Sequence, residues 1–218
     1  MRRSPGLWER RTQILLRTGL ADPVTNAEGR FLSVLARLSG QPFEPPGQPP
    51  TPASNWRLFA ELRDELLRLR SLEPHERGYS FEAFLKRSFD ASGLEARDPF
   101  RNTGEQIAGS FQLGHETYLL EAKWLAAPTG NRDLHAFHGK LEGKAAWARG
   151  LFVSFTGFTE EGLISVGTGK RVICMEGRDL YEALDRQIPV KAVLERKVRH
   201  AAETGRPFAP VNLLFPAR

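Results

Sequence analysis

The chain has 218 residues, of which 40% are hydrophobic and 26% charged, and its formal net charge is +5. This composition is typical of a soluble globular protein with one medium domain and a smaller appendage. No apolar run reaches the length of a transmembrane helix, no signal peptide is predicted, and Cys174 is the only cysteine. We therefore expect a cytoplasmic protein without a membrane contact or an intrachain disulfide, and the positive charge favours nucleic acid as the partner.

Residues 1–53 are expected to form a helical arm and a proline-rich linker. Apolar residues recur at helical spacing over the first part, and a run rich in proline follows from 41 to 52. Residues 54–78 are expected to form a connecting helix whose apolar stripe, from Trp56 to Leu69, packs against the main domain, with a break over 74–78.

Residues 79–218 have the pattern of an α/β domain with a mixed central sheet flanked by helices. A helix is predicted from Ser80 to about Ser92, and two more helices over 133–149 and 159–166. Strands are predicted over 94–97, 106–111, 118–124, 151–155 and 171–175, and a final helical region over 179–204 with a break near Pro189.

The segment 118–124 combines an acid and a base inside an otherwise apolar strand. Alternate side chains of a strand share a face, so Glu121 and Lys123 point the same way, while Leu120 and Trp124 point into a core. A carboxylate that binds Mg²⁺ and a lysine that orients the attacking water would serve phosphodiester hydrolysis. The alternative interpretation is a simple ion pair on an exposed strand.

Several short motifs, in this order and spacing, resemble the Mrr-like restriction endonucleases of the PD-(D/E)xK superfamily. The resemblance extends from about Gly78 to Leu184 and implies a restriction-endonuclease-like core, here with an N-terminal helical extension. The motifs are Arg77–Leu85, Gly104–Phe111, Tyr118–Trp124, Gly150–Ser154 and Gly157–Thr159.

The resemblance also implies roles for individual residues. In that family a helix glutamate, a strand aspartate and an E-x-K pair converge on a site for Mg²⁺ or Mn²⁺, and these positions match Glu82, Ala108, Glu121 and Lys123. Glu82 would act either as a direct metal ligand or as a group that supports the ligands without touching the metal. Lys140 would border the site, and the alternative is a solvated lysine. The implied function is a metal-dependent endonuclease that cuts DNA in restriction or phage defence, as a homodimer or within a larger defence complex.

Ala108 departs from the family pattern, because a methyl group cannot bind a metal. Glu105 would replace the missing carboxylate only if a bulge turned it to the other face of its strand. A single change of the Asp-to-Ala kind within an otherwise complete frame suggests a variant that was inactivated deliberately. The alternative is a natural pseudo-nuclease that acts as a DNA-binding or scaffold subunit.

Other polar features are expected to be structural or solvated. His135 and His138 have a spacing that zinc sites use, but no further ligands accompany them. Lys144 shares a helix face with Lys140. The run 167–170 lacks the full phosphate-loop pattern and is expected to be a turn. The basic residues over 191–206 are expected to form a solvated face, and the alternative is a track that binds DNA phosphates.

Overall fold

The computed structural model describes residues 52–102 and 105–216, without the side chains of 52–55, 101, 102, 105 and 106. The expected N-terminal arm and the linker up to residue 51 lie outside the described residues. Residues 52 and 53, which were expected to end the linker, instead begin α3. The compact unit that holds the described residues extends from Pro52 to Arg218, so the helix expected to connect the two parts belongs to this unit.

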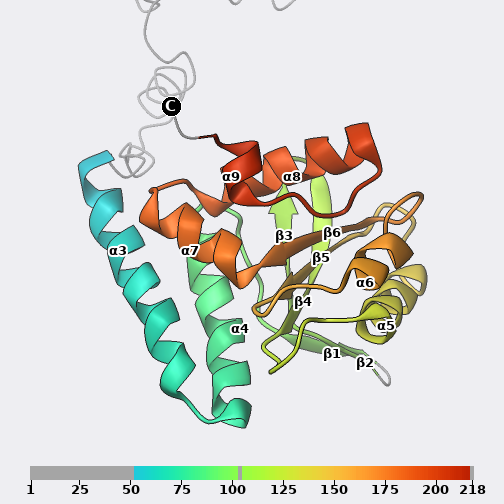
Figure 1. Ribbon diagram of the computed structural model, residues 1–218, viewed down its shortest axis with the longest axis horizontal. Helices are drawn as coiled ribbons and strands as arrows, with labels where there is room; N and C mark the ends of the chain where they lie inside the picture. The colour runs from blue at the N-terminus through green and yellow to red at the C-terminus, as the bar shows by residue number, and fades with distance from the viewer. Residues whose placement is uncertain (1–51, 103–104, 217–218) are drawn as a thin grey trace, which may run out of the picture. The chain divides into compact units, whose positions relative to one another are not determined.

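A mixed sheet of four strands forms the centre of the unit, in the order β3-β4-β5-β6 (Figure 1). β4 pairs with β3 in antiparallel orientation and with β5 in parallel orientation, and β5 pairs with β6 in parallel orientation. A separate two-stranded sheet is formed by β1 and β2. The strands are β1 (Phe100–Asn102), β2 (Glu105–Ile107), β3 (Gly109–Leu113), β4 (Glu116–Lys123), β5 (Arg149–Ser154) and β6 (Val172–Glu176).

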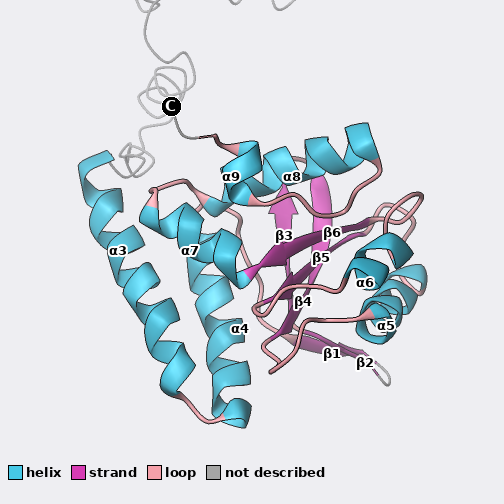
Figure 2. Cartoon of the chain, viewed as in Figure 1, coloured by secondary structure: helices cyan, strands magenta, loops and turns pink. Residues whose placement is uncertain are grey.

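Helices cover both faces of this sheet (Figure 2). Consecutive residues of β5 show this directly, because Leu151 and Val153 belong to one core cluster and Phe152 belongs to the other. The first cluster includes residues of α3, α4, α7 and α8, and the second includes residues of α5. The helices are α3 (Pro52–Arg68), a 3-10 turn η1 (Leu69–Ser71), α4 (Pro74–Asp90), α5 (Asn131–Glu142), α6 (Glu160–Ser165), α7 (Gly177–Asp185), α8 (Val190–Thr204) and α9 (Val211–Leu214).

Burial on both faces explains why the parallel strands are almost wholly apolar. Every residue of β5 after Arg149 is buried, as are the first four residues of β6. Strands covered by helices on both sides need apolar side chains in both directions, so they show no alternation of polar and apolar residues. The mixed α/β fold expected from the sequence is confirmed.

Four details of the expected secondary structure were wrong. The expected break over 74–78 is the first turn of α4, where Pro74 fits because the first helical N–H needs no partner. The expected strand over 106–111 is divided between β2 and β3 at Ala108, and the helix expected to reach residue 149 ends at Glu142. The strand expected over 94–97 is reduced to an isolated bridge between Arg97 and Ser110.

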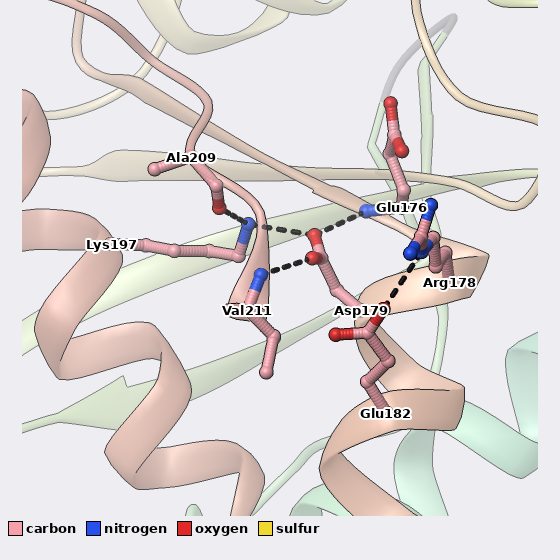
Figure 3. Close-up of polar contacts among 7 residues, drawn as sticks. All are labelled: Glu176, Arg178, Asp179, Glu182, Lys197, Ala209 and Val211. Carbon is pink, nitrogen blue, oxygen red and sulfur yellow. Dashed lines mark hydrogen bonds and ion pairs between the residues drawn. The ribbon is translucent and has the colours of Figure 1, made fainter. Parts of the chain in front are cut away.

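A buried ion pair joins α7 to α8 (Figure 3). The Lys197 ammonium donates a hydrogen bond to the Asp179 carboxylate at 2.7 Å and another to the Ala209 carbonyl at 2.6 Å. Asp179 also accepts hydrogen bonds from the backbone N–H groups of Glu176 and Val211. Both charged side chains are buried, so Lys197 does not belong to the solvated basic face expected near the C-terminus. This network stabilises the packing of α7, α8 and the start of α9.

Candidate active site

β4 places Glu121 and Lys123 on one face near its C-terminal end. The neighbouring Leu120 points the other way and is buried in the first core cluster, as the alternation of a strand requires. The Glu121 side chain is only 13% exposed, and its Oε1 lies 3.9 Å from the Lys123 Nζ. The strand therefore presents a half-buried acid and base side by side.

α5 brings a second lysine to the same carboxylate. Lys140 Nζ donates a hydrogen bond to Glu121 Oε2 at 2.8 Å, and its side chain is 23% exposed. Charge-assisted hydrogen bonds of this length are among the stronger polar contacts in proteins, particularly when partly screened from water. Each oxygen of the Glu121 carboxylate thus has an ammonium group near it.

Ala108 lies beside Glu121 at the interruption between β2 and β3. Its N–H donates to the Leu120 carbonyl at 3.0 Å, and Gly109 is the register partner of Leu120 on β4. Gly109 has a φ of +152°, and a Cβ atom added there would lie 2.7 Å from the Arg97 carbonyl oxygen. The interruption therefore depends on glycine and holds residue 108 next to the E-x-K strand.

α4 brings Glu82 to the site. The residues around it on this helix, including Phe81, Phe84 and Leu85, anchor α4 in the core, which leaves the half-buried Glu82 beside the sheet. Burial raises the pKa of the Glu82 carboxyl above its ordinary value, and the Glu121 carboxylate raises it further. Lys123 acts in the opposite direction.

These five residues line one cavity of about 290 Å³, together with Ala122. The sequence therefore identified a set of residues that the fold brings together: Glu82, Ala108, Glu121, Lys123 and Lys140. A water molecule takes about 30 Å³ of liquid, so the cavity has room for a larger side chain at position 108 and for several waters or a phosphate group.

The residues present do not fit a divalent metal site. Among the residues that the structure describes, no group of three or more His, Cys, Asp or Glu side chains could hold a metal ion. Mg²⁺ requires oxygen ligands in near-octahedral geometry, whereas this cavity offers two carboxylates, one of which is hydrogen-bonded to Lys140. The side chain of Glu105 lies outside the described residues.

The sequence reasoning missed Asp133 as a neighbour of this site. Asp133 lies in the first turn of α5, and its Oδ1 is 4.0 Å from the Lys123 Nζ. The sequence did contain a signal for this residue. Asp133 is an acid in the first turn of the helix after the E-x-K strand, and such a residue lies near the end of that strand.

Other candidates from the sequence lie outside the cavity. His138 is buried on α5, with its Nδ1 3.6 Å from Glu142 Oε1, and belongs to no metal-binding group within the described ranges. Lys144 follows the end of α5 and does not line the cavity. The run 167–170 is a turn before β6, as expected.

Comparison with protein families identifies the chain. Residues 74–184 match the restriction endonuclease family Mrr_cat, and this match covers half of the chain. The chain belongs to this family. The matched residues extend from α4 to α7 and include all five residues around the cavity. A comparison with curated proteins found no match.

Three solved structures are similar at low identity. A protein of unknown function, AF1548, is 20% identical over 56% of this chain and 78% of its own, with a TM-score of 0.43. The MspJI restriction endonuclease in complex with a 27-mer oligonucleotide is 14% identical over 75% of this chain and 39% of its own, with a TM-score of 0.38. The DNA modification-dependent restriction endonuclease AspBHI is 16% identical over 84% of this chain and 50% of its own, with a TM-score of 0.41. The chain spans half or less of these two restriction enzymes.

None of the helices in the described part of the chain is long and apolar enough to cross a membrane.

Proposed function

We propose that this Mrr_cat chain has the architecture of a Mg²⁺-dependent endonuclease that cuts DNA, with its metal site interrupted at Ala108. The observation that carries the proposal is the single cavity lined by Glu82, Ala108, Glu121, Lys123 and Lys140. Because the two remaining carboxylates do not fit a divalent cation, we expect the chain as it stands to bind DNA without cutting it efficiently.

The two lysines give the cavity its affinity for a phosphodiester. Lys123 and Lys140 both line it, and their ammonium groups lie within 4 Å of the Glu121 carboxylate. An ammonium group binds phosphate as a point charge, and one placed beside the scissile bond would offset the negative charge that develops during hydrolysis. Glu121 holds both lysines in place in the absence of a substrate.

Restoring the missing carboxylate tests the proposal. The variant Ala108→Asp is expected to nick or linearise supercoiled plasmid DNA in Mg²⁺ or Mn²⁺, whereas the parent chain leaves it intact. Calorimetric titration with Mn²⁺ should show binding to the variant that the parent lacks. The matched control is Ala108→Asn, which has the same size but no charge and should neither cut nor bind the metal with comparable affinity.

Two further controls connect any cleavage to this cavity. Changing Glu121 to Gln, or Lys123 to Met, in the Ala108→Asp background should abolish cleavage while leaving the circular dichroism spectrum unchanged. The proposal is wrong if the folded Ala108→Asp variant neither binds Mn²⁺ nor cuts DNA.

A natural pseudo-nuclease is the second candidate function, and the Lys140–Glu121 hydrogen bond favours it. This contact leaves Glu121 compensated without a metal, so the site is electrostatically satisfied as it stands. The codon at position 108 of the natural gene distinguishes these two candidates. An aspartate codon would indicate a nuclease that was inactivated deliberately, and an alanine codon would indicate a natural pseudo-nuclease.

The assembly and biological setting are also proposed. A restriction or phage-defence role is proposed by analogy with the family, and cutting both DNA strands would be served by a homodimer or a larger defence complex. Light scattering of the full chain, with and without DNA, measures the assembly directly. A strictly monomeric species in both conditions would contradict the proposed homodimer.

A further inference from the structure

Two loops at the amino-terminal edge of the parallel strands form a continuous surface. The first, 143–148, joins α5 to β5, and the second, 166–171, joins α6 to β6. The Gly150 N–H donates to the Arg171 carbonyl at 2.7 Å, and the Arg171 guanidinium donates to the backbone carbonyls of Ala145 and Ala146. We call these two loops together the Trp147 surface.

The Trp147 surface is basic. Its two loops contain Lys144, Lys170 and Arg171 and no acidic residue. Lys170 is exposed. The pKa of His138 on α5 is held below its ordinary value first by burial and then by the charge of Lys170, while Glu142 acts in the opposite direction. The same positive field that opposes a proton on His138 would attract a phosphate.

Trp147 is the most unusual residue of this surface. Its side chain is 72% exposed, although an indole is among the largest apolar groups and is normally packed against other residues. Proteins that hold nucleic acid strands combine a basic groove with exposed aromatic rings, because every base has a face on which such a ring can stack. An exposed indole on the same pair of loops as Lys144 and Arg171 has this chemistry.

The surface is close enough to the cavity for one DNA strand to touch both. Lys140 lines the cavity and precedes Trp147 by seven residues in the sequence. Even a fully extended chain of that length reaches only about 25 Å, or roughly seven base steps at 3.4 Å each. Between Lys140 and Trp147 lie the exposed Glu142 and Gly143, and the lack of a side chain at Gly143 allows a close approach.

We propose that the Trp147 surface binds the DNA strand beyond the catalytic cavity, with its cations on phosphates and Trp147 stacked on a base that has left the helical stack. The inference rests on the proposed function for the identity of the substrate, but it concerns binding and does not require cutting. It assigns a role to residues outside the cavity and predicts that this contact is independent of position 108.

The test uses the full chain with Ala108 and a fluorescein-labelled oligothymidylate, whose bases are unpaired. Binding is measured by fluorescence anisotropy at several salt concentrations. Trp147→Ala should weaken binding by about tenfold or more, and Trp147→Phe should retain most of the affinity because it retains a ring. Lys170→Glu should weaken binding and reduce the slope of log K against log salt by about one.

The matched control is Lys191→Glu, the same charge change at an exposed position of α8, a helix that packs in the other core cluster. It should bind the oligonucleotide nearly as tightly as the parent. The inference is overturned if Trp147→Ala and Lys170→Glu bind like Lys191→Glu, if Trp147→Phe loses as much affinity as Trp147→Ala, or if the parent chain binds no oligonucleotide at low salt. Intact binding together with an inactive Ala108→Asp variant would instead overturn the proposed function alone.

Discussion

Asp179→Asn should destabilise the fold strongly, because it leaves the Lys197 ammonium buried without a counter-charge. In the parent chain the Lys197 ammonium lies 2.7 Å from the Asp179 carboxylate, and both side chains are buried (Figure 3). Asparagine preserves the volume of the side chain and one acceptor oxygen. Its NH2 group would face an N–H donor, because both Asp179 oxygens accept hydrogen bonds, so the substitution removes the charge and one acceptor together. The Ala209 carbonyl would remain as a partner for Lys197.

The loss of unfolding free energy on Asp179→Asn has an upper limit. Removing one member of a buried ion pair typically costs about 3–5 kcal/mol of unfolding free energy. Lys197 can avoid the penalty of a buried charge by losing its proton, which costs about 1.4 kcal/mol for each pH unit below its unfolded pKa of roughly 10.4. This route costs about 4.6 kcal/mol at pH 7 and about 1.9 kcal/mol at pH 9.

The sign of the pH dependence follows from these protonation states. In the folded variant the pKa of Lys197 is lowered, so the unfolded state binds more protons and the stability of the variant rises with pH up to the unfolded pKa. In the parent chain, burial lowers the pKa of Lys197 but Asp179 raises it, so the stability of the parent changes less over the same pH range. The stability difference between the two proteins should therefore shrink by about 2–3 kcal/mol from pH 7 to pH 9.

Urea unfolding at both pH values measures this difference. The control is Glu182→Gln, which breaks the Glu182–Arg178 pair on the surface of the same helix and should change the unfolding free energy little, because water screens an exposed pair. A cost below about 1 kcal/mol for Asp179→Asn, or a cost that grows with pH, would refute the reasoning.

Three further predictions concern the site and its surroundings. Burial and Glu121 raise the pKa of Glu82 in the folded protein, so the contribution of the Glu82 carboxyl to stability falls as pH rises from its unfolded pKa of about 4.3 through its folded pKa. Glu82→Gln should therefore melt at a higher temperature than the parent at pH 7, and a lower melting temperature would contradict this. Thr159→Ala removes the hydroxyl that accepts a backbone hydrogen bond at the start of α6 and should cost about 1 kcal/mol in urea unfolding, whereas Thr159→Ser should cost little. Gly109→Ala places a Cβ atom 2.7 Å from a backbone carbonyl oxygen and should cost about 1–3 kcal/mol, with no cost indicating that the β2–β3 interruption moves freely.

Local patterns in the sequence were sufficient to predict the E-x-K strand. The alternation around Glu121 depends only on the geometry of a single strand, and the parallel strands β5 and β6 appeared as short apolar runs because both of their faces are covered. The position of Ala108 within its motif was also apparent from the sequence. The identity of the residues around the cavity therefore came largely from the one-dimensional pattern and its family resemblance.

The interruption between β2 and β3 was less predictable. The sequence pattern over 106–111 is compatible with one continuous strand. The division appears only in the structure, where the pairing with β4 begins at Gly109 and this glycine has a positive φ. The extension of α4 to Pro74 was missed for a related reason, since a proline and a glycine suggest a break unless the helix packs where those residues fit.

The sequence by itself determined the strand that carries Glu121 and Lys123, the order of the core elements and the family. The tertiary structure alone decided that Asp133 would lie near Lys123 and that Lys197 would be buried against Asp179. It also gave Lys140, which the resemblance had placed at the border of the site, its hydrogen bond to Glu121. The reason is physical: the periodicity of one element depends on its own backbone, whereas the distance between charges on different elements depends on how those elements pack. The sequence contains both kinds of information, but only the first can be read locally.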